Sequence, residues 1–325
     1  MDRLRRHPGL AHFTRGHLAQ LERCTTRRRA PKGEVLIRDG EEAREAFFLL
    51  SGSVEVRRPT PYGEFLLARL ATGDMFGELA LLDGEPRAGS VVAASEVELL
   101  SLDPSAIQQA AEGDSSFEVA LYWTLWKSLS RKLRANNLKL VRFFHRHALP
   151  PPPATLTPPT PLAVDLATRQ RVFQELGLSN MEVNYLASLA EAWELAPNQP
   201  LLQDGEAGRV LYVVISGRIM ISKHIPGAGE EALAFLGRGE LFGEMALIDD
   251  SPRCADAKAD ADGATVLSLR KEVLDRLLDI RKASSIRVLR ILCRRLAQRV
   301  REGNDKLIGW YILSGGGQSE EITAP

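Results

Sequence analysis

One seven-residue motif occurs twice in this chain, in a register that is constant to one residue. Phe76-Gly77-Glu78-Leu79-Ala80-Leu81-Leu82 returns 166 positions later as Phe242-Gly243-Glu244-Met245-Ala246-Leu247-Ile248. Two glycine turns that precede the motif return after 165 positions: Asp39-Gly40 as Asp204-Gly205, and Ser51-Gly52 as Ser216-Gly217. Such a register indicates an internal duplication. The 325 residues are therefore expected to form two similar domains, each long enough to bury its own core.

Short β-strands separated by turn residues are expected around the motif. The strands predicted in the first half lie within residues 33–40, 47–56, 65–70, 90–93 and 97–102. Many short strands at regular spacing are typical of a small antiparallel barrel or jelly roll. Apolar residues recur about every fourth position over 115–147, and a similar helix is expected over 271–302. The expected fold class is mainly β with flanking α, in which a long amphipathic helix follows each jelly roll.

The boundary between the two domains is expected at a proline-rich segment. Four consecutive prolines at 150–153 and three more within 158–161 are typical of a semi-rigid linker. A docking motif for a proline-reading module is the alternative. The predicted division is domain 1–148, linker 149–162, domain 163–314 and a disordered tail 315–325.

Two helix starts carry capping signals. Thr14 is a plausible N-cap for a helix around Leu18 and Leu21. In the second half, helices are expected over 169–176 and 181–193. Ser179, with Glu182 three residues later, predicts a capping box at the start of the second of these helices.

Composition argues against several classes of function. The net charge is zero, so no global field favours nucleic acid or a membrane. No apolar run is long enough for a spanning helix, and the charged N-terminus lacks the apolar segment of a signal peptide. The cysteines at 24, 254 and 293 lack the spacing of a metal site and are expected to be reduced, as in the cytoplasm. No catalytic motif was found, so the chain is not expected to be an enzyme or to need a metal or a cofactor.

Each motif copy places one carboxylate and one guanidinium nine positions apart. Gly77 lets the backbone approach a ligand closely, and a short helix after it would direct free N–H groups at an anion. Arg87 suits a phosphate, because a guanidinium forks onto two oxygens. Glu78 suits a hydroxyl, which a carboxylate accepts well. Together these groups predict a ribose phosphate site, repeated at Glu244 and Arg253. The alternative is that the two charges of each copy form an internal salt bridge.

These residues resemble the phosphate-binding cassette of the cyclic-nucleotide-binding domain family, whose pattern is Phe-Gly-Glu-(Leu/Ile)-Ala-Leu, a spacer, and Pro-Arg-Ala-Ala-(Thr/Ser). The tandem arrangement resembles regulatory subunits of cyclic-AMP-dependent protein kinases, and each domain resembles the sensor domain of bacterial cyclic-AMP receptor regulators. The resemblance implies that the Glu takes the ribose 2′-hydroxyl, the Arg takes the cyclic phosphate and nearby backbone amides complete the cup. The implied ligand-binding residues are Gly77, Glu78, Leu79, Ala80, Arg87, Ala88, Gly89, Ser90, Gly243, Glu244, Met245, Ala246, Arg253, Cys254 and Ala255.

The resemblance also implies an aromatic lid over the base, supplied by a helix after the barrel. The candidates are Tyr122, Trp123 and Trp126 for the first site, and Trp310 or Tyr311 for the second. Aromatic residues on amphipathic helices are often part of the core instead, so this alternative stays open.

The two copies depart from the family pattern to different degrees. The first has Gly89 in place of an Ala and keeps Ser90, whereas the second has Asp256 where Thr or Ser is usual. A carboxylate that pointed at a phosphate would repel it, and residues 257–262 have weak β-propensity. A stronger first site is therefore expected, with a second that is weaker, differently selective or empty.

The sequence predicts a cytoplasmic, non-enzymatic sensor that binds cyclic AMP in preference to cyclic GMP, since Ala88 lacks the hydroxyl that often reaches guanine and Cys254 is a weak substitute. Ligand would move the long helices to control an effector protein, such as a kinase or another enzyme, or a homodimer. Nucleic acid is not expected, because no helix-turn-helix follows the last long helix. The basic helix 115–147 presents either a solvated face or a docking surface for an acidic partner or nucleic acid.

Three alternatives to this function remain. The chain could be a scaffold with one or both sites empty, or a receptor for another nucleotide such as a cyclic dinucleotide. Inhibition of a kinase through Arg27-Arg28-Arg29-Ala30, which fits a pseudosubstrate pattern, is the third.

Overall fold

The chain folds into two compact units, which are described one at a time. In the computed structural model the described residues are 10–11, 13–144, 156–225, 229–248, 251–278 and 285–316. One unit comprises residues 1–139 and 280–325, and the other comprises 140–279. The last long helix thus belongs to the first unit, although it follows the second barrel in the sequence. Half of the predicted linker and most of the predicted tail lie outside the described residues.

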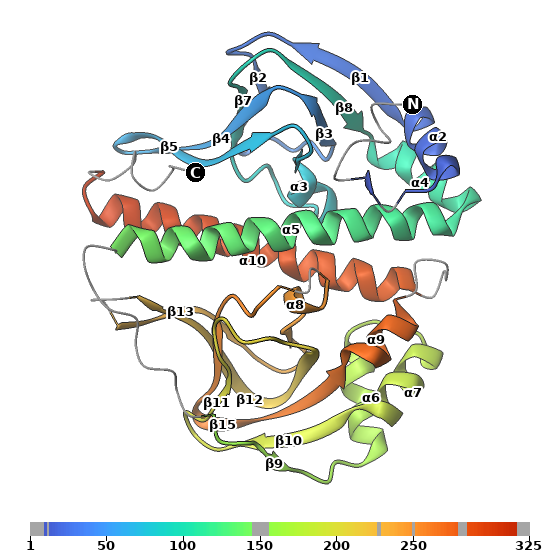
Figure 1. The fold of residues 1–325 in the computed structure, drawn as a ribbon, viewed down its shortest axis with the longest axis vertical. Coiled ribbons are helices and arrows are strands. Elements are labelled where there is room, and N and C mark those ends of the chain that lie inside the picture. Colours follow the sequence, from blue (N-terminus) through green and yellow to red (C-terminus); the bar gives the residue numbers. More distant parts are fainter. Residues whose placement is uncertain are drawn as a thin grey trace. The chain divides into compact units, whose positions relative to one another are not determined.

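The barrel of the first unit consists of two four-stranded antiparallel sheets (Figure 1). Their strand orders are β1-β8-β3-β6 and β2-β7-β4-β5. The strands are β1 (Thr25–Ala30), β2 (Val35–Ile37), β3 (Ala46–Ser51), β4 (Ser53–Thr60), β5 (Gly63–Ala71), β6 (Met75–Phe76), β7 (Ser90–Ala93) and β8 (Val97–Leu102). The predicted jelly roll is confirmed, and the five expected strand regions contain strands.

The core of this barrel lies between its two sheets. Leu49 and Leu99, both fully buried, come from one sheet, and Val54 and Val91 come from the other. Phe76 of β6 stacks on Phe47 of β3, with ring centroids 5.1 Å apart. This stack anchors the start of the first motif copy in the core.

The described residues of the first unit also form the helices α2 (Arg15–Arg23), α3 (Glu78–Asp83), α4 (Pro104–Gly113), α5 (Ser115–Phe144) and α10 (Ser285–Leu313). Thr14 caps α2 as predicted. The helix expected over 115–147 is α5, and α10 packs against it (Figure 1). Their contacts include a hydrogen bond of 2.8 Å from Asn136 Nδ2 to Asn304 Oδ1 and ion pairing of Arg290 with Glu118.

The described strands of the second unit form one sheet. In it β12 and β15 are long strands, and each takes the place of two consecutive strands of the first barrel. The strand order is β13-β12-β15-β10-β9, with β11 paired to β15 and β14 paired to β12. The strands are β9 (Thr160–Pro161), β10 (Glu191–Leu195), β11 (Pro200–Leu202), β12 (Val210–Ile225), β13 (Gly229–Leu236), β14 (Leu241–Phe242) and β15 (Asp256–Arg270). Its helices are α6 (Leu166–Glu175), α7 (Asn180–Leu189), α8 (Met245–Ile248) and α9 (Lys271–Leu277).

Two expectations about local structure were wrong, and a segment of weak β-propensity nevertheless forms a strand. The helix expected to reach Trp193 ends at Leu189, because Ala190 adopts an extended conformation and the chain enters β10, where Trp193 pairs with Val266. The helix expected over 271–302 is two described helices, α9 and α10. Residues 257–262 lie within β15 despite their weak propensity, since the small side chains of Ala257 and Ala259 are buried in the core.

The proposed pseudosubstrate segment is itself part of the barrel. Arg27, Arg28 and Arg29 belong to β1, which pairs antiparallel with β8 along its whole length. Arg27 also forms an ion pair of 2.7 Å with Glu98. A strand held in this way does not resemble the free arm that a pseudosubstrate needs.

Replacing Phe76 with alanine is expected to destabilise the first unit by about 3–5 kcal/mol, because it removes a buried ring and leaves a cavity. Urea unfolding would measure the change in the free energy of unfolding. Val35→Ala on the same barrel is the control, since Val35 is 38% exposed and its truncation should cost less than about 1 kcal/mol. Equal losses for the two variants would contradict the role given to the Phe47–Phe76 stack.

Candidate functional site

The second residue of the first motif copy is a glycine that no other residue could replace without displacing its neighbours. Gly77 precedes α3 with φ of 77°, a left-handed conformation. A Cβ built on it would lie 2.8 Å from the Glu45 carbonyl oxygen and 2.9 Å from Nη1 of Arg87. The absent side chain therefore makes room for the arginine. Gly243 has the same conformation, with φ of 83°, and the same proximity to Arg253.

Arg87 is buried and bonded to backbone. Its Nη1 donates to the Gly77 carbonyl over 2.8 Å. Its own carbonyl accepts from the Gly40 N–H, and its N–H donates to the Glu41 carbonyl, each over 3.0 Å. Its Nε has no partner among the described residues. Burial lowers the pKa of Arg87, while the charges of Glu45 and Glu41 act in the opposite direction. The result is a buried cation with hydrogen-bonding capacity to spare.

Glu78 is fully buried and paired with a lysine from α5. Its Oε1 accepts from Lys132 Nζ over 2.5 Å, and the same ammonium donates to the Met75 carbonyl over 2.8 Å. The other carboxylate oxygen, Oε2, is buried without a partner in the described part of the chain. The alternative in which Glu78 and Arg87 neutralise each other is therefore not the arrangement of the first copy.

Lys132 was not predicted as a site residue. It lies 54 positions beyond Glu78, so no local motif connects the two. A signal was present nonetheless. Lys132 follows the apolar Leu129 by three positions, which places it on the helix face that packs against the barrel.

The second copy repeats this backbone framework. Arg253 Nη1 donates to the Gly243 carbonyl over 2.6 Å. The Gly205 N–H donates to the Arg253 carbonyl, and the Arg253 N–H donates to the Glu206 carbonyl, over 2.9 and 2.8 Å. Tyr212 and Phe242 stack at 5.2 Å, as Phe47 and Phe76 do. The duplication thus extends from the motif to individual hydrogen bonds.

The second arginine is bound more fully by its own domain. Arg253 Nη2 donates to the Val210 carbonyl over 2.8 Å, a contact additional to those of Arg87. Gly208 lies directly against the guanidinium, and a Cβ there would lie 2.0 Å from Arg253 Nε. The corresponding residue of the first copy is Ala43. Fewer of the donors of Arg253 are therefore available to a ligand.

Asp256 takes the structural place of Ser90. Ser90 Oγ accepts from the Asp39 N–H over 3.0 Å, and Asp256 Oδ1 accepts from the Asp204 N–H over 2.8 Å. Lys223 lies close by and forms an ion pair of 2.5 Å with Asp204. Burial raises the pKa of Asp256. This carboxylate therefore fixes a turn, a role that the sequence did not reveal.

The remaining predicted residues lie beside these groups. Ala80 and Ala246 are buried in their short helices, and Cys254 Sγ lies 3.7 Å from Met245 Sδ. Leu79, Gly89 and Ala255 belong to the same cassettes by sequence. Their contact with a ligand stays a prediction.

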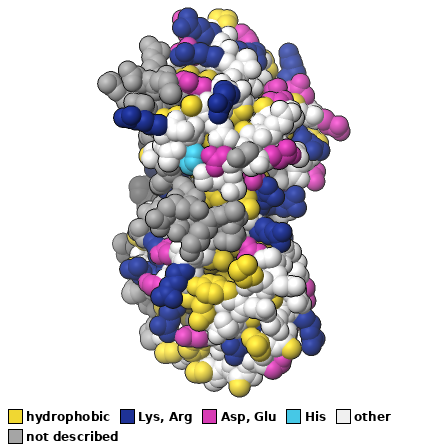
Figure 2. Space-filling model, turned by 90° about the vertical axis from the view of Figure 1, so that its right-hand side faces the viewer, with side chains coloured by type: hydrophobic (Ala, Val, Ile, Leu, Met, Phe, Trp, Pro, Cys, Tyr) yellow, Lys and Arg dark blue, Asp and Glu magenta, His cyan; other side chains and the backbone are white. Residues whose placement is uncertain are grey.

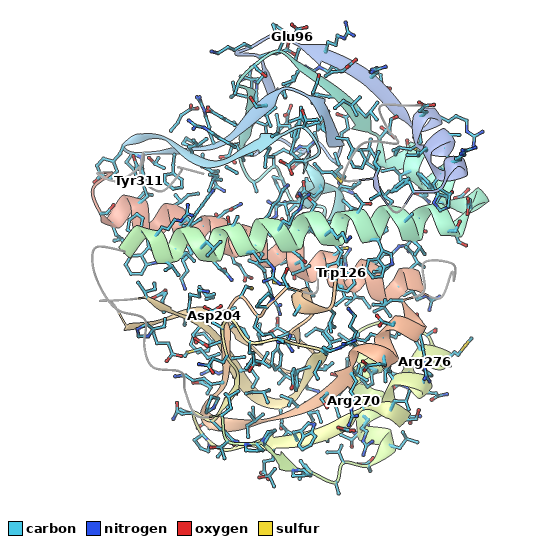
Figure 3. All side chains as sticks on the ribbon, viewed as in Figure 1. Glu96, Trp126, Asp204, Arg270, Arg276 and Tyr311 are labelled. Atoms are coloured by element: carbon cyan, nitrogen blue, oxygen red, sulfur yellow. The ribbon has the colours of Figure 1, made fainter. Side chains whose placement is uncertain are left out.

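The predicted lid residues are found in different environments. Trp126 is 1% exposed, and its ring lies 5.3 Å from that of Trp123 on α5. Tyr311 lies near the end of α10 (Figure 3). Its ring packs on Phe65 of the first barrel, with centroids 4.7 Å apart. Their role as lids stays a prediction.

The basic face of α5 is partly used inside the first unit. Arg131 pairs with Asp74 at 3.4 Å, and Lys139 donates to the Leu67 carbonyl. Acidic and basic side chains are both spread over the face drawn in Figure 2. None of the described helices has an apolar stretch of the length that a membrane span requires.

The sequence model of the cyclic nucleotide-binding domain matches this chain twice, over residues 27–114 and 192–281. Together these matches cover more than half of the chain and include both motif copies. The chain belongs to the cyclic nucleotide-binding domain family. The predicted family and fold class are thereby confirmed.

Relatives of these cyclic nucleotide-binding domains include kinases and transcription regulators. A cGMP-dependent protein kinase of Caenorhabditis elegans is 25% identical over 278 residues, which is 85% of this chain and 30% of the kinase. The cyclic AMP receptor protein of Thermus thermophilus is 37% identical over 131 residues, which is 40% of this chain and 58% of that protein. The chain thus spans about a third of the length of the kinase it matches.

Solved structures with partial likeness belong to the same family. The regulatory domain of Toxoplasma gondii PKA, crystallised with cAMP, is 20% identical and covers 89% of this chain and 92% of that chain, with a TM-score of 0.32. A cyclic nucleotide-binding domain from Methylobacillus flagellatus is 29% identical and covers 43% and 81%, with a TM-score of 0.39. The family assignment rests on the sequence model and not on these superpositions.

Gly77→Ala is expected to destabilise the first unit by more than Gly33→Ala. Both glycines have positive φ, so each alanine pays a strain of about 1–2 kcal/mol. Gly33 has open space around its would-be Cβ, whereas Gly77 has the Glu45 carbonyl and Arg87 within 3 Å. Chemical denaturation of the two variants would separate the clash from the strain. Equal losses of stability would show that Gly77 is needed only for its left-handed backbone conformation and not for the space around Arg87.

Asp256→Ser is expected to stabilise the second unit at pH 7 by roughly 0.5–1 kcal/mol. Because burial raises the pKa of Asp256, the folded state binds its proton more tightly than the unfolded state does. The destabilisation is therefore present above the folded pKa and is lost as the pH falls below the unfolded value. Urea unfolding at pH 7 and pH 4 measures the effect, and the gain should shrink at the lower pH.

The reverse substitution in the first barrel, Ser90→Asp, is the matched control for Asp256→Ser. It should lower stability at pH 7. A loss of stability at pH 7 for Asp256→Ser would contradict this account of the carboxylate.

Proposed function

We propose that this protein is a regulatory sensor that binds cyclic AMP in its first cup and transmits occupancy through its long helices to an effector. The observation that carries the proposal is that one cassette contains two buried charged groups, each with an atom that lacks a hydrogen-bond partner among the described residues. Glu78 keeps one carboxylate oxygen without a partner, and Arg87 keeps Nε without one. Buried polar atoms are normally satisfied, so a missing partner points to a ligand. A ribose hydroxyl supplies the donor that the Glu78 oxygen lacks. A phosphate oxygen supplies the acceptor that Arg87 Nε lacks.

The proposed signal passes through Lys132. This residue belongs to α5 and its ammonium bonds the Glu78 carboxylate, so the helix is connected directly to the cassette. A ligand hydroxyl that donates to Glu78 competes with Lys132 for this carboxylate and alters the strength of their ion pair. The free energy available for moving α5 equals the difference in ligand affinity between its two positions.

The proposed preference for cyclic AMP rests on Ala88, which has no hydroxyl with which to reach guanine. The second cup is proposed to be weaker, because Arg253 already donates to two carbonyls of its own domain. The effector is proposed to be a kinase or another enzyme, or a second copy of this chain in a homodimer. Cys24, Cys254 and Cys293 form no disulfide in the structure, which suits the proposed cytoplasmic location.

Thermal melts with cyclic AMP, cyclic GMP and cyclic dinucleotides test the proposal. Cyclic AMP at 100 times its dissociation constant should stabilise the first unit by about 2.7 kcal/mol, and cyclic GMP should need a higher concentration. A shift with a cyclic dinucleotide alone would favour the alternative receptor. No shift with any of these nucleotides would support a scaffold with empty sites.

Arg87→Leu and Arg253→Leu show which cup is filled. Arg87→Leu should abolish the shift with cyclic AMP at low concentration, because the leucine cannot bind the phosphate. Arg253→Leu should leave most of that shift in place. The opposite pattern would assign the stronger site to the second barrel.

The assignment of Glu78 to the ribose is tested with 2′-deoxy cyclic AMP. The wild type should lose about 1.5–3 kcal/mol of binding free energy to this analogue, the value of a hydrogen bond to a charged group. Glu78→Gln should narrow the difference between the two ligands. Calorimetry on the four combinations gives the coupling energy, and a coupling near zero would remove Glu78 from the ribose.

A further inference from the structure

Helix α10 follows the second barrel in the sequence, yet it contacts the cassette of the first. Arg301 binds the Asp83 carboxylate with both prongs of its guanidinium, Nε to Oδ2 over 2.6 Å and Nη2 to Oδ1 over 3.0 Å. Its Nη1 donates to the Pro86 carbonyl over 2.9 Å. The Asp83 side chain is 4% exposed and that of Arg301 18%, so the pair is largely shielded from solvent.

The segment held by Arg301 connects the two ligand-binding charges of the first cup. Asp83 is the last residue of α3, which begins at Glu78, and Pro86 immediately precedes Arg87. Between them Gly84 ends the helix in a left-handed conformation with φ of 77°. Within the turn, the Gly84 N–H donates to the Ala80 carbonyl over 3.2 Å and the Glu85 N–H donates to Asp83 Oδ1 over 3.1 Å. The fork of Arg301 onto a carboxylate and a carbonyl adds a restraint from another helix.

A second contact of α10 reaches the cassette beyond Arg87. Asp305 Oδ1 accepts from Arg58 Nη1 over 3.3 Å, and the same nitrogen donates to the Ala88 carbonyl over 3.1 Å. Asp305 lies one helical turn after Arg301, so the two side chains share a face of α10. The helix therefore contacts the cassette directly before Arg87 and through Arg58 after it.

We propose that Arg301 is a positioning residue for the first cup and that α10 is a clamp built into the chain for that cup. This inference rests on the proposed function of the first site. Holding residues 83–86 in place fixes Arg87 relative to Glu78 before ligand arrives, which reduces the ordering cost of binding. Because α10 is covalently continuous with the second repeat, the clamp links the affinity of the first cup to that repeat. The linkage is reciprocal, so ligand in the first cup also holds α10.

The test uses the full chain with Arg253→Leu as the parent, so that binding reports the first cup. Arg301→Gln should weaken cyclic AMP binding roughly five- to twentyfold by calorimetry, the range of a moderate coupling. Arg294→Gln is the matched control, since it removes the same charge from an exposed position on the same helix and should change nothing. Arg301→Lys, which keeps the charge but not the fork, should fall between these variants.

A charge-reversed pair separates positioning from general stability. Asp83→Arg combined with Arg301→Asp should bind more tightly than either single variant, because the ion pair is restored. The inference is overturned if the parent binds cyclic AMP and Arg301→Gln binds equally well or better, or if the reversed pair gains nothing. A parent that binds no cyclic nucleotide while Arg87 is intact would instead overturn the proposed function, and this inference with it.

Discussion

Each site of this protein depends on one hydrogen bond, from an arginine Nη1 to the carbonyl of a left-handed glycine. The bond measures 2.8 Å at Gly77 and 2.6 Å at Gly243. It places a cation in a buried position without giving it a carboxylate partner. Desolvation of that cation is costly, and the surrounding carbonyls offset it only in part. The fold therefore holds in each copy a buried guanidinium whose Nε has no partner among the described residues.

The sequence was sufficient for the features that depend on local spacing. The motif pair, the capping boxes and the strand regions follow from residues close together in the chain, and the structure confirms them. The contacts of Lys132 and Arg301 could not be predicted in the same way. The contact of Lys132 spans 54 residues and that of Arg301 spans 218. The spacing of a helix indicates which face meets the barrel, but it does not identify the carboxylate that an Arg or Lys will bind. Trp193 shows a different kind of error: its local sequence predicted a helix, but the residue lies in β10 and pairs with β15.

The two cups differ because the protein uses the same groups differently in each. In both, the guanidinium Nε has no partner among the described residues. In the first, Lys132 reaches the carboxylate from a helix. In the second, Arg253 donates to two carbonyls and Asp256 is used to fix the turn at Asp204. The two copies thus share a hydrogen-bond framework, while the groups around each arginine differ. The motif alone predicts the framework and not these differences.

The membership of α10 in the first unit has a consequence for synthesis of the chain. A ribosome completes β1 to α5 long before it reaches residue 285, so the apolar face of α5 lacks its helical partner while the second barrel is made. The first unit reaches its final packing only when nearly the whole chain has emerged. Contacts of such large sequence separation form slowly and leave apolar surface exposed for longer. The strands of the first barrel are therefore made first, but the unit that contains them is completed last.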